Sequence, residues 1–515
     1  MVPVLSTSGL FVPTVATLLT LLVIKIVIYR LFISRLATLP GPRLAALTYW
    51  YECYYDIFQP AQYVFKIQEL HKTFGPLVRI TPSEVSIADP EFLYSLYAPG
   101  IGHKRDKAIG KVKALGINTS VGGAIDHDLH RRRREALNPF FSSHRIATLA
   151  SYLNNKAQQL EERFCQSANT GKVVNLSDIY YGFANDVVNE YCFGYRPNLL
   201  GDPALAHVKR ENVNGVLRGV KFNLYFSWLR GLMRKLPPSI AARFTPPGIR
   251  DMIRFRIGIR KDICAILNDK TDHNTNHQND TNVRSIFHEL RDSPLLPDTE
   301  KSPQRFEDEA TLLVMAGIQS AQLSLTLAHD HLLANPAVMD KLRAELASQP
   351  SSTLAQLKQL PYLNGIIQEA HRLGFGLTGR NARVSPDQPI IYTDKMSRQT
   401  WTLPPGTSIS ISTLLVHANE EIFPDHLRFD PERWLRSDGI TRRKYQMAFS
   451  KGPRICIGMH LANAEMAVAI AAMARWDMKL FETTDQDVAF LHDYHIATPK
   501  LTSKGVRVNV IGRAG

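Results

Sequence analysis

The sequence predicts a mainly α-helical protein with a minor β part, preceded by a single membrane-spanning helix. Apolar residues recur at helical spacing through most of the chain, whereas alternating, strand-like stretches are few and short. Only one long apolar segment exists, near the N-terminus, which excludes a polytopic membrane protein. With 515 residues, 44% of them hydrophobic and 21% charged, the chain can bury a sizeable core, which excludes wholesale disorder.

The first expected element is a membrane anchor at residues 1–35. Residues 10–29 form an almost unbroken apolar run whose only charge is Lys25. About twenty helical residues, at about 1.5 Å each, match a hydrocarbon core of roughly 30 Å. A cleaved secretory signal fits less well, because no basic residue precedes the run and the run is too long. The basic residues lie at or beyond its C-terminal end, which predicts a cytosolic body: Lys25, Arg30, Arg35 and Arg43.

A basic, proline-containing hinge is expected next, at residues 36–58, because Pro40 and Pro42 cannot continue a helix. The body, residues 59–515, shows no internal repeat and is expected to form one large unit. Its predicted helices lie at residues 59–73, 129–137, 146–168, 178–192, 249–268, 305–334, 354–373 and 461–475. Strand-like alternation predicts a hairpin at residues 77–88 and short strands at residues 389–392, 407–411 and 506–510.

One segment of the body, residues 268–282, is almost wholly polar, and we expect it to form a mobile loop. His273 and His277 within it have the i,i+4 spacing of two metal ligands on a helix. The residues around them do not favour helix, so a solvated loop is the preferred interpretation.

Charge and cysteine content indicate the kind of partner and the cellular compartment to expect for this protein. The 61 basic residues outnumber the 47 acidic ones, giving a formal net charge of +14, which suits an anionic partner or a membrane surface. The five cysteines are scattered and include no C-x-x-C pair, so neither a disulfide framework nor a structural zinc site is expected. A reducing compartment is therefore predicted.

The most informative stretch is residues 449–458, with the sequence FSKGPRICIG. Cys456 lies between glycines, two residues after Arg454 and just before an apolar helix, whose N-terminus stabilises negative charge. We therefore expect a thiol that deprotonates readily and serves as a metal ligand or as a nucleophile. The nucleophile would need a neighbouring base, for which His460 is available. A buried core cysteine fits poorly beside Arg454 and Lys451.

This stretch resembles the haem-binding loop of the cytochrome P-450 family, F-x-x-G-x-R-x-C-x-G, at every fixed position. Residues 369–372 match the E-x-x-R helix of that family, and residues 429–434 match the segment that completes its Glu–Arg–Arg triad. Alone, Glu369 and Arg372 would be read as an ordinary helical ion pair. Three motifs in the right order favour the resemblance instead, which runs from the anchor to the C-terminus.

The resemblance assigns roles to individual residues. Cys456 is implied to be the axial ligand of the iron in haem b, with Phe449 in the same loop, and a thiolate there favours O–O cleavage. Haem propionates are implied to pair with Arg454, Arg134 and Arg383, with Arg380 as a competitor of Arg383. His130 takes the place of the family's usual tryptophan and keeps a ring N–H donor. Glu369, Arg372 and Arg433 form the implied structural triad.

The predicted helix at residues 305–334 carries the family's oxygen-activation segment in altered form. The usual pattern A-G-x-(D/E)-T-T reads here as Ala316-Gly317-Ile318-Gln319-Ser320-Ala321. Gly317 keeps the kink point where oxygen would lie, and Ser320 keeps a hydroxyl. Gln319 replaces the acid, and a glutamine cannot relay a proton by ionising.

The function implied is that of a microsomal monooxygenase, anchored by a single pass in the endoplasmic reticulum membrane and in contact with its lipid. It would insert one atom of O2 into a lipophilic substrate, with electrons from NADPH through cytochrome P-450 reductase, and no nucleic-acid partner is expected. The motif wording resembles filamentous-fungal members that oxidise terpenoids or other secondary metabolites. Two alternatives stay open: rearrangement or dehydration of an oxygenated substrate, and a non-catalytic haem-binding protein. The reductase is expected to dock on a basic surface near Cys456: Lys451, Arg442, Arg443, Lys444 and some of Arg131–Arg133.

Overall fold

The structure is a computed structural model, and it describes residues 8–109, 116–194, 197–226, 228, 246–268, 285–349 and 353–514. Its helices and small sheets confirm the predicted fold class. The polar segment predicted to be a mobile loop lies outside the described residues from position 269 onward, and so do His273 and His277.

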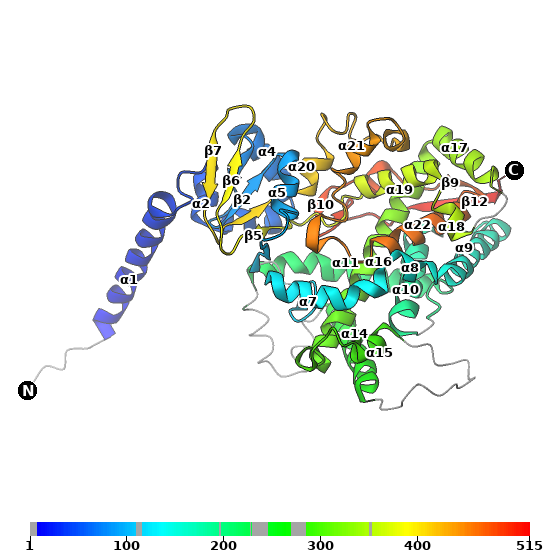
Figure 1. Cartoon of the computed structure of the whole chain (residues 1–515), viewed down its shortest axis with the longest axis horizontal. Helices are drawn as coiled ribbons and strands as arrows, with labels where there is room; N and C mark the ends of the chain where they lie inside the picture. The colour runs from blue at the N-terminus through cyan, green and yellow to red at the C-terminus, as the bar shows by residue number, and fades with distance from the viewer. Residues whose placement is uncertain are drawn as a thin grey trace, which may run out of the picture.

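The N-terminal helix stands apart from the rest of the protein. Helix α1 (Ser8–Ile28) continues into a short π-helix, η1 (Tyr29–Ile33), and Figure 1 shows α1 projecting from the body. Its apolar span, Pro13–Ile33, has a mean hydropathy of 2.2 and is not buried at all. Helix α16 (Pro303–Ala334) is also long and apolar, but 61% of its most apolar stretch is buried in the body. The first helix therefore has the properties of a membrane anchor, whereas α16 is a core helix.

The chain after α1 and η1 is built of short helices that pack onto the body. Helix α2 (Arg43–Leu47), helix α3 (Trp50–Cys53) and π-helix η2 (Tyr54–Phe58) occupy much of the segment predicted to be a hinge. Ala45, Cys53 and Asp56 are buried. At Gly41 a Cβ atom would lie 2.5 Å from the carbonyl oxygen of Arg79, so this close approach requires glycine.

Helix α16 runs through the main core and packs against α10, α14, α19 and α22 (Figure 1). The larger helices of this core are α7 (His127–Leu137), α9 (Ala150–Thr170), α10 (Leu176–Phe193), α11 (Pro203–Tyr225), α14 (Pro247–Asn268), α19 (Pro361–Leu373) and α22 (Met459–Met473). Their buried faces share one apolar cluster, which fixes the position of α16 relative to the loop before α22.

Helix boundaries differ from the sequence prediction in three places. The helix expected at residues 354–373 is divided into α18 (Leu354–Leu357) and α19, because Pro361 takes the first position of a new helix. The helix expected at residues 146–168 is divided into α8 (Ser143–Ala147) and α9. Helices α11 and α17 (Pro336–Ala347) were not predicted at all.

A five-stranded sheet of order β1-β2-β8-β5-β3 forms the largest β part. It contains the predicted hairpin, β1 (Leu77–Arg79) and β2 (Glu84–Ile87), and continues through β8 (Ser408–Ser410), β5 (Arg383–Val384) and β3 (Asp106–Lys107). Three smaller sheets complete the fold: β4-β12-β9 (Val174–Asn175, Arg507–Arg513, Trp476–Leu480), β6-β7 (Ile390–Thr393, Thr400–Leu403) and β10-β11 (His492–Asp493, Ala497–Thr498). In the largest sheet, the register of β3 with β5 sets Lys107 directly opposite Arg383.

Candidate functional site

The loop of residues 449–458 is a tight turn that leads into helix α22. The backbone N–H of Cys456 donates to the carbonyl oxygen of Phe449 at 2.8 Å, closing the loop. Gly452 has a φ of +69°, and a Cβ atom there would lie 2.1 Å from the carbonyl oxygen of Tyr97. Only glycine can occupy that position, and the turn therefore holds the thiol in a fixed place before the helix.

The side chain of Cys456 is exposed to the space beside the loop. Desolvation by the protein atoms around it nevertheless raises the pKa of the thiol, and the backbone N–H of Gly458 and the charge of Arg134 offset this increase only in part. The sequence-based expectation of a readily deprotonated thiol is therefore wrong for the protein without a ligand. No histidine, His460 included, is hydrogen-bonded to the Cys456 sulfur within the described part of the chain. A poorly ionised thiol without a base is a weak nucleophile, whereas a metal ion deprotonates such a thiol outright. The geometry favours a metal ligand.

A group of buried and half-buried basic residues lies around one side of this loop. Arg454 donates to the carbonyl oxygens of Ala124 and Ile125, each at 2.7 Å, and its Nε has no partner within the described residues. Burial, and then the charge of Arg383, lower the pKa of Arg454 to about 10. Burial also lowers the pKa of Arg383, whose guanidinium lies over the ring of Tyr97.

Lys107 and His130 belong to the same group. The ammonium of Lys107 donates to the carbonyl oxygen of Gly122 at 2.7 Å, and burial, followed by Arg383 and Arg454, lowers its pKa to about 7. Burial and the neighbouring cations lower the pKa of His130 to about 2. Like charges placed directly opposite one another on paired strands destabilise a sheet. Lys107 and Arg383 are therefore unfavourable neighbours unless an anion lies beside them.

The nearby carboxylates do not neutralise this group. Asp106 and Asp126 lie near Arg454, but Asp106 accepts from the backbone N–H of His127 and Asp126 caps helix α7 through the N–H of Leu129. Neither forms an ion pair with the buried cations in the part of the chain that the structure describes. The group therefore fits an anionic ligand that presents carboxylates beside Cys456, and the two propionates of haem meet that description.

The structure separates Arg383 from its competitor. Arg380 is buried and forms ion pairs with Glu52 and with Glu84, the latter at 3.0 Å. Arg383 forms no ion pair within the described residues and donates to the carbonyl oxygens of Asn381 and Ala382. Of the two, Arg383 is thus the arginine left without a carboxylate partner in the described chain.

The arginine run of helix α7 is divided between two faces. Arg131 and Arg132 are exposed, whereas Arg133 is buried and pairs with Glu300 at 2.7 Å. Arg134 donates to the carbonyl oxygen of Ile455 at 2.6 Å, next to Cys456, and to the side-chain oxygen of Asn138. Arg134 therefore lies against the Cys456 loop, and the buried ring of His130 lies near both Arg134 and Arg454.

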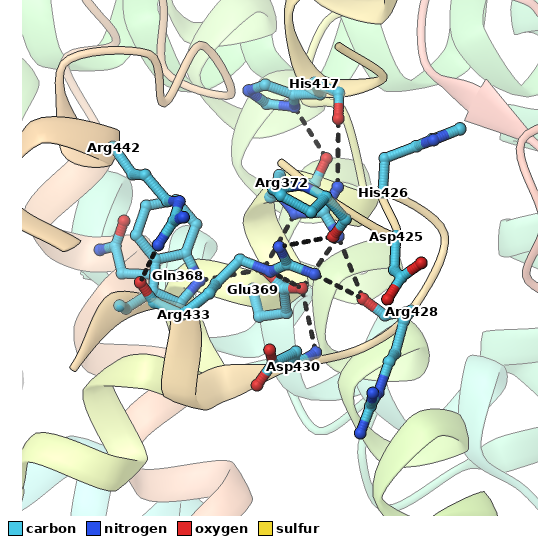
Figure 2. Close-up of polar contacts among 12 residues, drawn as sticks. Gln368, Glu369, Arg372, His417, Asp425, His426, Arg428, Asp430, Arg433 and Arg442 are labelled. Carbon is cyan, nitrogen blue, oxygen red and sulfur yellow. Dashed lines mark hydrogen bonds and ion pairs between the residues drawn. The ribbon is translucent and has the colours of Figure 1, made fainter. Parts of the chain in front are cut away.

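The three residues of the predicted structural triad are in contact with one another (Figure 2). Glu369 accepts from Nε and Nη2 of Arg372 at 2.9 and 2.8 Å, and from Nε of Arg433 at 2.9 Å. All three side chains are buried. The sequence analysis missed two further members: Trp434 donates its indole N–H to Glu369 at 2.9 Å, and His417 accepts at Nε2 from the backbone of Met447. His417 also contacts the carbonyl oxygen of Arg372, so it joins the triad to the segment that enters the loop.

The residues predicted to lie beside bound oxygen do not all face the same way. Ser320 is exposed on α16 and donates to the carbonyl oxygen of Ala316 at 2.7 Å. Gly317 faces α10 instead, where a Cβ atom would lie 2.7 Å from Val188, so this glycine serves close helix packing. Gln319 is buried, and its amide N–H donates to the side-chain oxygen of Asn214 on α11 at 3.1 Å.

The surface expected to dock a reductase has fewer free charges than the sequence suggested. Arg442 is half-buried, pairs with Asp438 and donates to the carbonyl oxygen of Ile422. Lys444 lies 3.5 Å from Glu91, and Lys451 donates to the carbonyl oxygen of Arg443. Arg443 is exposed and forms no ion pair among the described residues, so it is an accessible cation of this group, as is the exposed Arg132 of α7.

Comparison with known proteins agrees with the geometry. A sequence model of the cytochrome P-450 family matches residues 39–500. The chain is 35% identical to the cytochrome P-450 monooxygenase tpcC of Cochliobolus heterostrophus, over 98% of this chain and 99% of the relative. It is 35% identical to the monooxygenase sdnE of Sordaria araneosa (97% and 98%) and 34% identical to the conidiogenone synthase of Penicillium rubens (94% and 96%). The chain belongs to the cytochrome P-450 family and is an oxygen-incorporating oxidoreductase that acts on a small molecule.

Proposed function

We propose that this protein is a membrane-anchored monooxygenase that holds haem b and inserts one atom of O2 into a lipophilic secondary metabolite, with a terpenoid as the leading class. Electrons come from NADPH through a membrane-bound cytochrome P-450 reductase. The observation that carries the proposal is the exposed thiol of Cys456 close to buried and half-buried cations that form no ion pair with a carboxylate in the described chain. The terpenoid class rests on the resemblance of residues 127–142 and 449–458 to filamentous-fungal members, and on relatives named as fungal monooxygenases.

Haem bound through a thiolate supplies the oxygen chemistry, because that ligand favours O–O cleavage. The chain supplies the rest. Cys456 ligates the iron as thiolate, with Arg134 close enough to favour its negative charge. Lys107, Arg383 and Arg454 would pair with the haem propionates, and these pairs would offset the cost of holding like charges together. The triad and His417 hold the loop in the conformation that presents the sulfur.

The membrane topology proposed is a single pass in the endoplasmic reticulum with a cytosolic catalytic domain. The exposed apolar span of α1 supports a membrane anchor, and the basic residues at its C-terminal end support a cytosolic body. Lipid is thus a partner of the N-terminal segment, and a lipophilic substrate is expected to reach the enzyme from the membrane.

A second reaction class is favoured by one observation, the neutral amide at Gln319. An enzyme that rearranges or dehydrates an already oxygenated substrate needs no proton donor for O–O cleavage. Ser320→Ala separates the two classes: in a monooxygenase, we expect peroxide to replace product while NADPH is still consumed. In a rearranging enzyme, the ratio of product to reductant is expected to stay unchanged.

The proposal is tested with a Cys456→Ser variant and with labelled oxygen. We expect the variant to lose the red-shifted carbon monoxide band of the reduced protein, because a hydroxyl does not replace the thiolate ligand. Cys165→Ser, at an exposed cysteine on α9, is the matched control and should keep the band. Metabolites from a host expressing the wild type should carry oxygen-18 from O2 and should be absent from the Cys456→Ser host. A band that persists in Cys456→Ser refutes the ligand assignment, and product without oxygen-18 refutes monooxygenation.

A further inference from the structure

A small cavity, with both polar and apolar side chains in its wall, lies between α11, α16 and residues 487–505, beside the oxygen-activation segment. Its volume is about 70 Å³, which is too small for a lipophilic substrate but large enough for several water molecules. Glu211 and Asn214 line it from α11, and Gln319 and Gln322 line it from α16. The cavity thus joins the position where an acid is missing to a carboxylate on a different helix.

These side chains form a hydrogen-bonded chain with a fixed direction. Asn214 donates from Nδ2 to Oε1 of Glu211 at 3.3 Å and accepts at Oδ1 from Nε2 of Gln319 at 3.1 Å. An ionised carboxylate can only accept, so Glu211 fixes the orientation of both amides. The carbonyl oxygen Oε1 of Gln319 is consequently left at the end of the chain. It is buried without a partner among the described residues, on a side chain that is 8% exposed.

A buried carbonyl oxygen without a partner is costly unless a donor reaches it, and a water molecule in the adjoining cavity, held also by the polar side chains in its wall, meets that need. Ser320 follows Gln319 directly in α16, with its hydroxyl on the next side of the helix. A water held by Gln319 therefore lies on the face of α16 that adjoins the face carrying the Ser320 hydroxyl, which does not itself line the cavity.

Glu211 is the carboxylate of this cavity suited to exchange protons with solvent. Its side chain is 42% exposed, and its ion pair with Arg210 at 3.2 Å is shared, because Arg210 also binds Asp178. Asp487, the other carboxylate in the cavity wall, accepts from Ser503, Lys500 and Thr484, and these contacts lower its pKa. Its oxygens are therefore occupied.

We propose that Glu211 takes the place of the missing acid and supplies the protons for oxygen activation, through waters in this cavity whose last member is held by Gln319. The inference rests on the proposed monooxygenase function. Each turnover converts O2 and one C–H bond to C–OH and one water, and it takes two electrons, from NADPH through the reductase, and two protons. Both protons enter from solvent at Glu211, which is reprotonated after each transfer.

The first test uses Glu211→Gln, which keeps an acceptor for Asn214 but cannot ionise. We expect the amount of product formed per NADPH to fall about 10-fold or more, and peroxide to be formed instead. For comparison, a general acid typically increases a reaction rate by roughly 10²–10⁴-fold. The solvent deuterium isotope effect on product formation should rise. The control variant Glu162→Gln, at an exposed acid on α9, should leave the product formed per NADPH and the solvent isotope effect unchanged.

The second test is rescue. Adding Gln319→Glu to Glu211→Gln places an ionisable group at the end of the same cavity, so the double variant should regain coupling. A structural clamp between α11 and α16 predicts no such rescue, because the double variant does not restore the original hydrogen bonds. Unchanged coupling in Glu211→Gln, or a loss of coupling without rescue, overturns the proposal.

A third measurement does not depend on turnover. A crystal structure of the haem-loaded wild type should show ordered waters between the carboxylate of Glu211 and Oε1 of Gln319. A dry cavity, or one closed by a side chain, overturns the relay. Failure of the proposed function is a separate result: the wild type itself would then show no oxygen-18 in product, whereas failure of the relay leaves wild-type product labelled.

Discussion

Replacing Lys107 by methionine should stabilise the apoprotein and weaken its affinity for haem. In the fold, the ammonium faces Arg383 across paired strands and lies near Arg454. Without an anionic ligand, this charge opposes folding, and methionine removes the charge while keeping a chain of similar length. With haem bound, the same ammonium pairs with a propionate, so its loss should weaken the complex. The prediction is distinctive because the same substitution should stabilise the apoprotein but weaken the haem complex.

The magnitude follows from the pKa of Lys107, which is lowered from its ordinary 10.5 to about 7. A shift of this size corresponds to about 5 kcal/mol of unfavourable free energy when the group is charged in both states. Between pH 7 and 10.5 the unfolded chain binds more protons at Lys107 than the folded one. Stability therefore rises with pH across that window, by up to about 1.4 kcal/mol per pH unit. From pH 7.5 to 9, this amounts to about 2 kcal/mol.

The assay compares urea unfolding of apo wild type and apo Lys107→Met at pH 7.5 and at pH 9. The variant should be the more stable protein at pH 7.5, and its advantage should shrink by about 2 kcal/mol at pH 9. Haem titration should show affinity reduced about 10- to 100-fold, because a hydrogen bond to a charged group contributes about 1.5–3 kcal/mol. Lys395→Met, at an exposed lysine, is the control.

Two results would refute this reasoning. An apo variant no more stable than wild type at pH 7.5 would show that the fold itself satisfies the charge of Lys107. Unchanged haem affinity would show that the ammonium does not meet a propionate.

Three further predictions concern the supporting structure and the surface. Lys221→Met should destabilise the protein by about 3–5 kcal/mol in thermal or urea unfolding. The reason is that Lys221 lies 2.9 Å from Asp56 and 3.2 Å from Asp493, and both carboxylates are buried. A change below about 1 kcal/mol would contradict this prediction. Trp434→Phe should cost about 1.5–3 kcal/mol and broaden the carbon monoxide band, since Glu369 loses one donor; equal stability would remove Trp434 from the triad's support. Arg443→Glu should raise the apparent KM for reductase and flatten its salt dependence, whereas Lys395→Glu should not; identical kinetics in both would place the docking surface elsewhere.

The parts predictable from the sequence are those fixed by local patterns. The apolar run of the anchor, the periodicity of α16 and the turn around Cys456 each depend on neighbouring residues, and the structure shows all three. Lys107 could not be found this way. It is a single lysine in a two-residue strand, and only the pairing of β3 with β5, nearly 280 positions apart, sets it beside Arg383. Trp434 was missed for a related reason, because its indole contacts Glu369 from another segment.

In the segment that resembles the oxygen-activation motif, the sequence pattern identifies some of the candidate residues but not all of them. Neighbouring residues of a helix point about 100° apart, so Gln319 and Ser320 could not be expected to face the same space. The motif therefore locates Ser320 but not the group that delivers protons to it. The proposed proton donor depends on which helix faces Gln319 across the cavity, and that helix, α11, was not predicted from the sequence. Once α11 is in place, the substitution of an acid by Gln319 becomes intelligible. Asn214 contacts the amide of Gln319, and the carboxylate of Glu211 lies three residues away on the same helix, at the solvent end of the cavity.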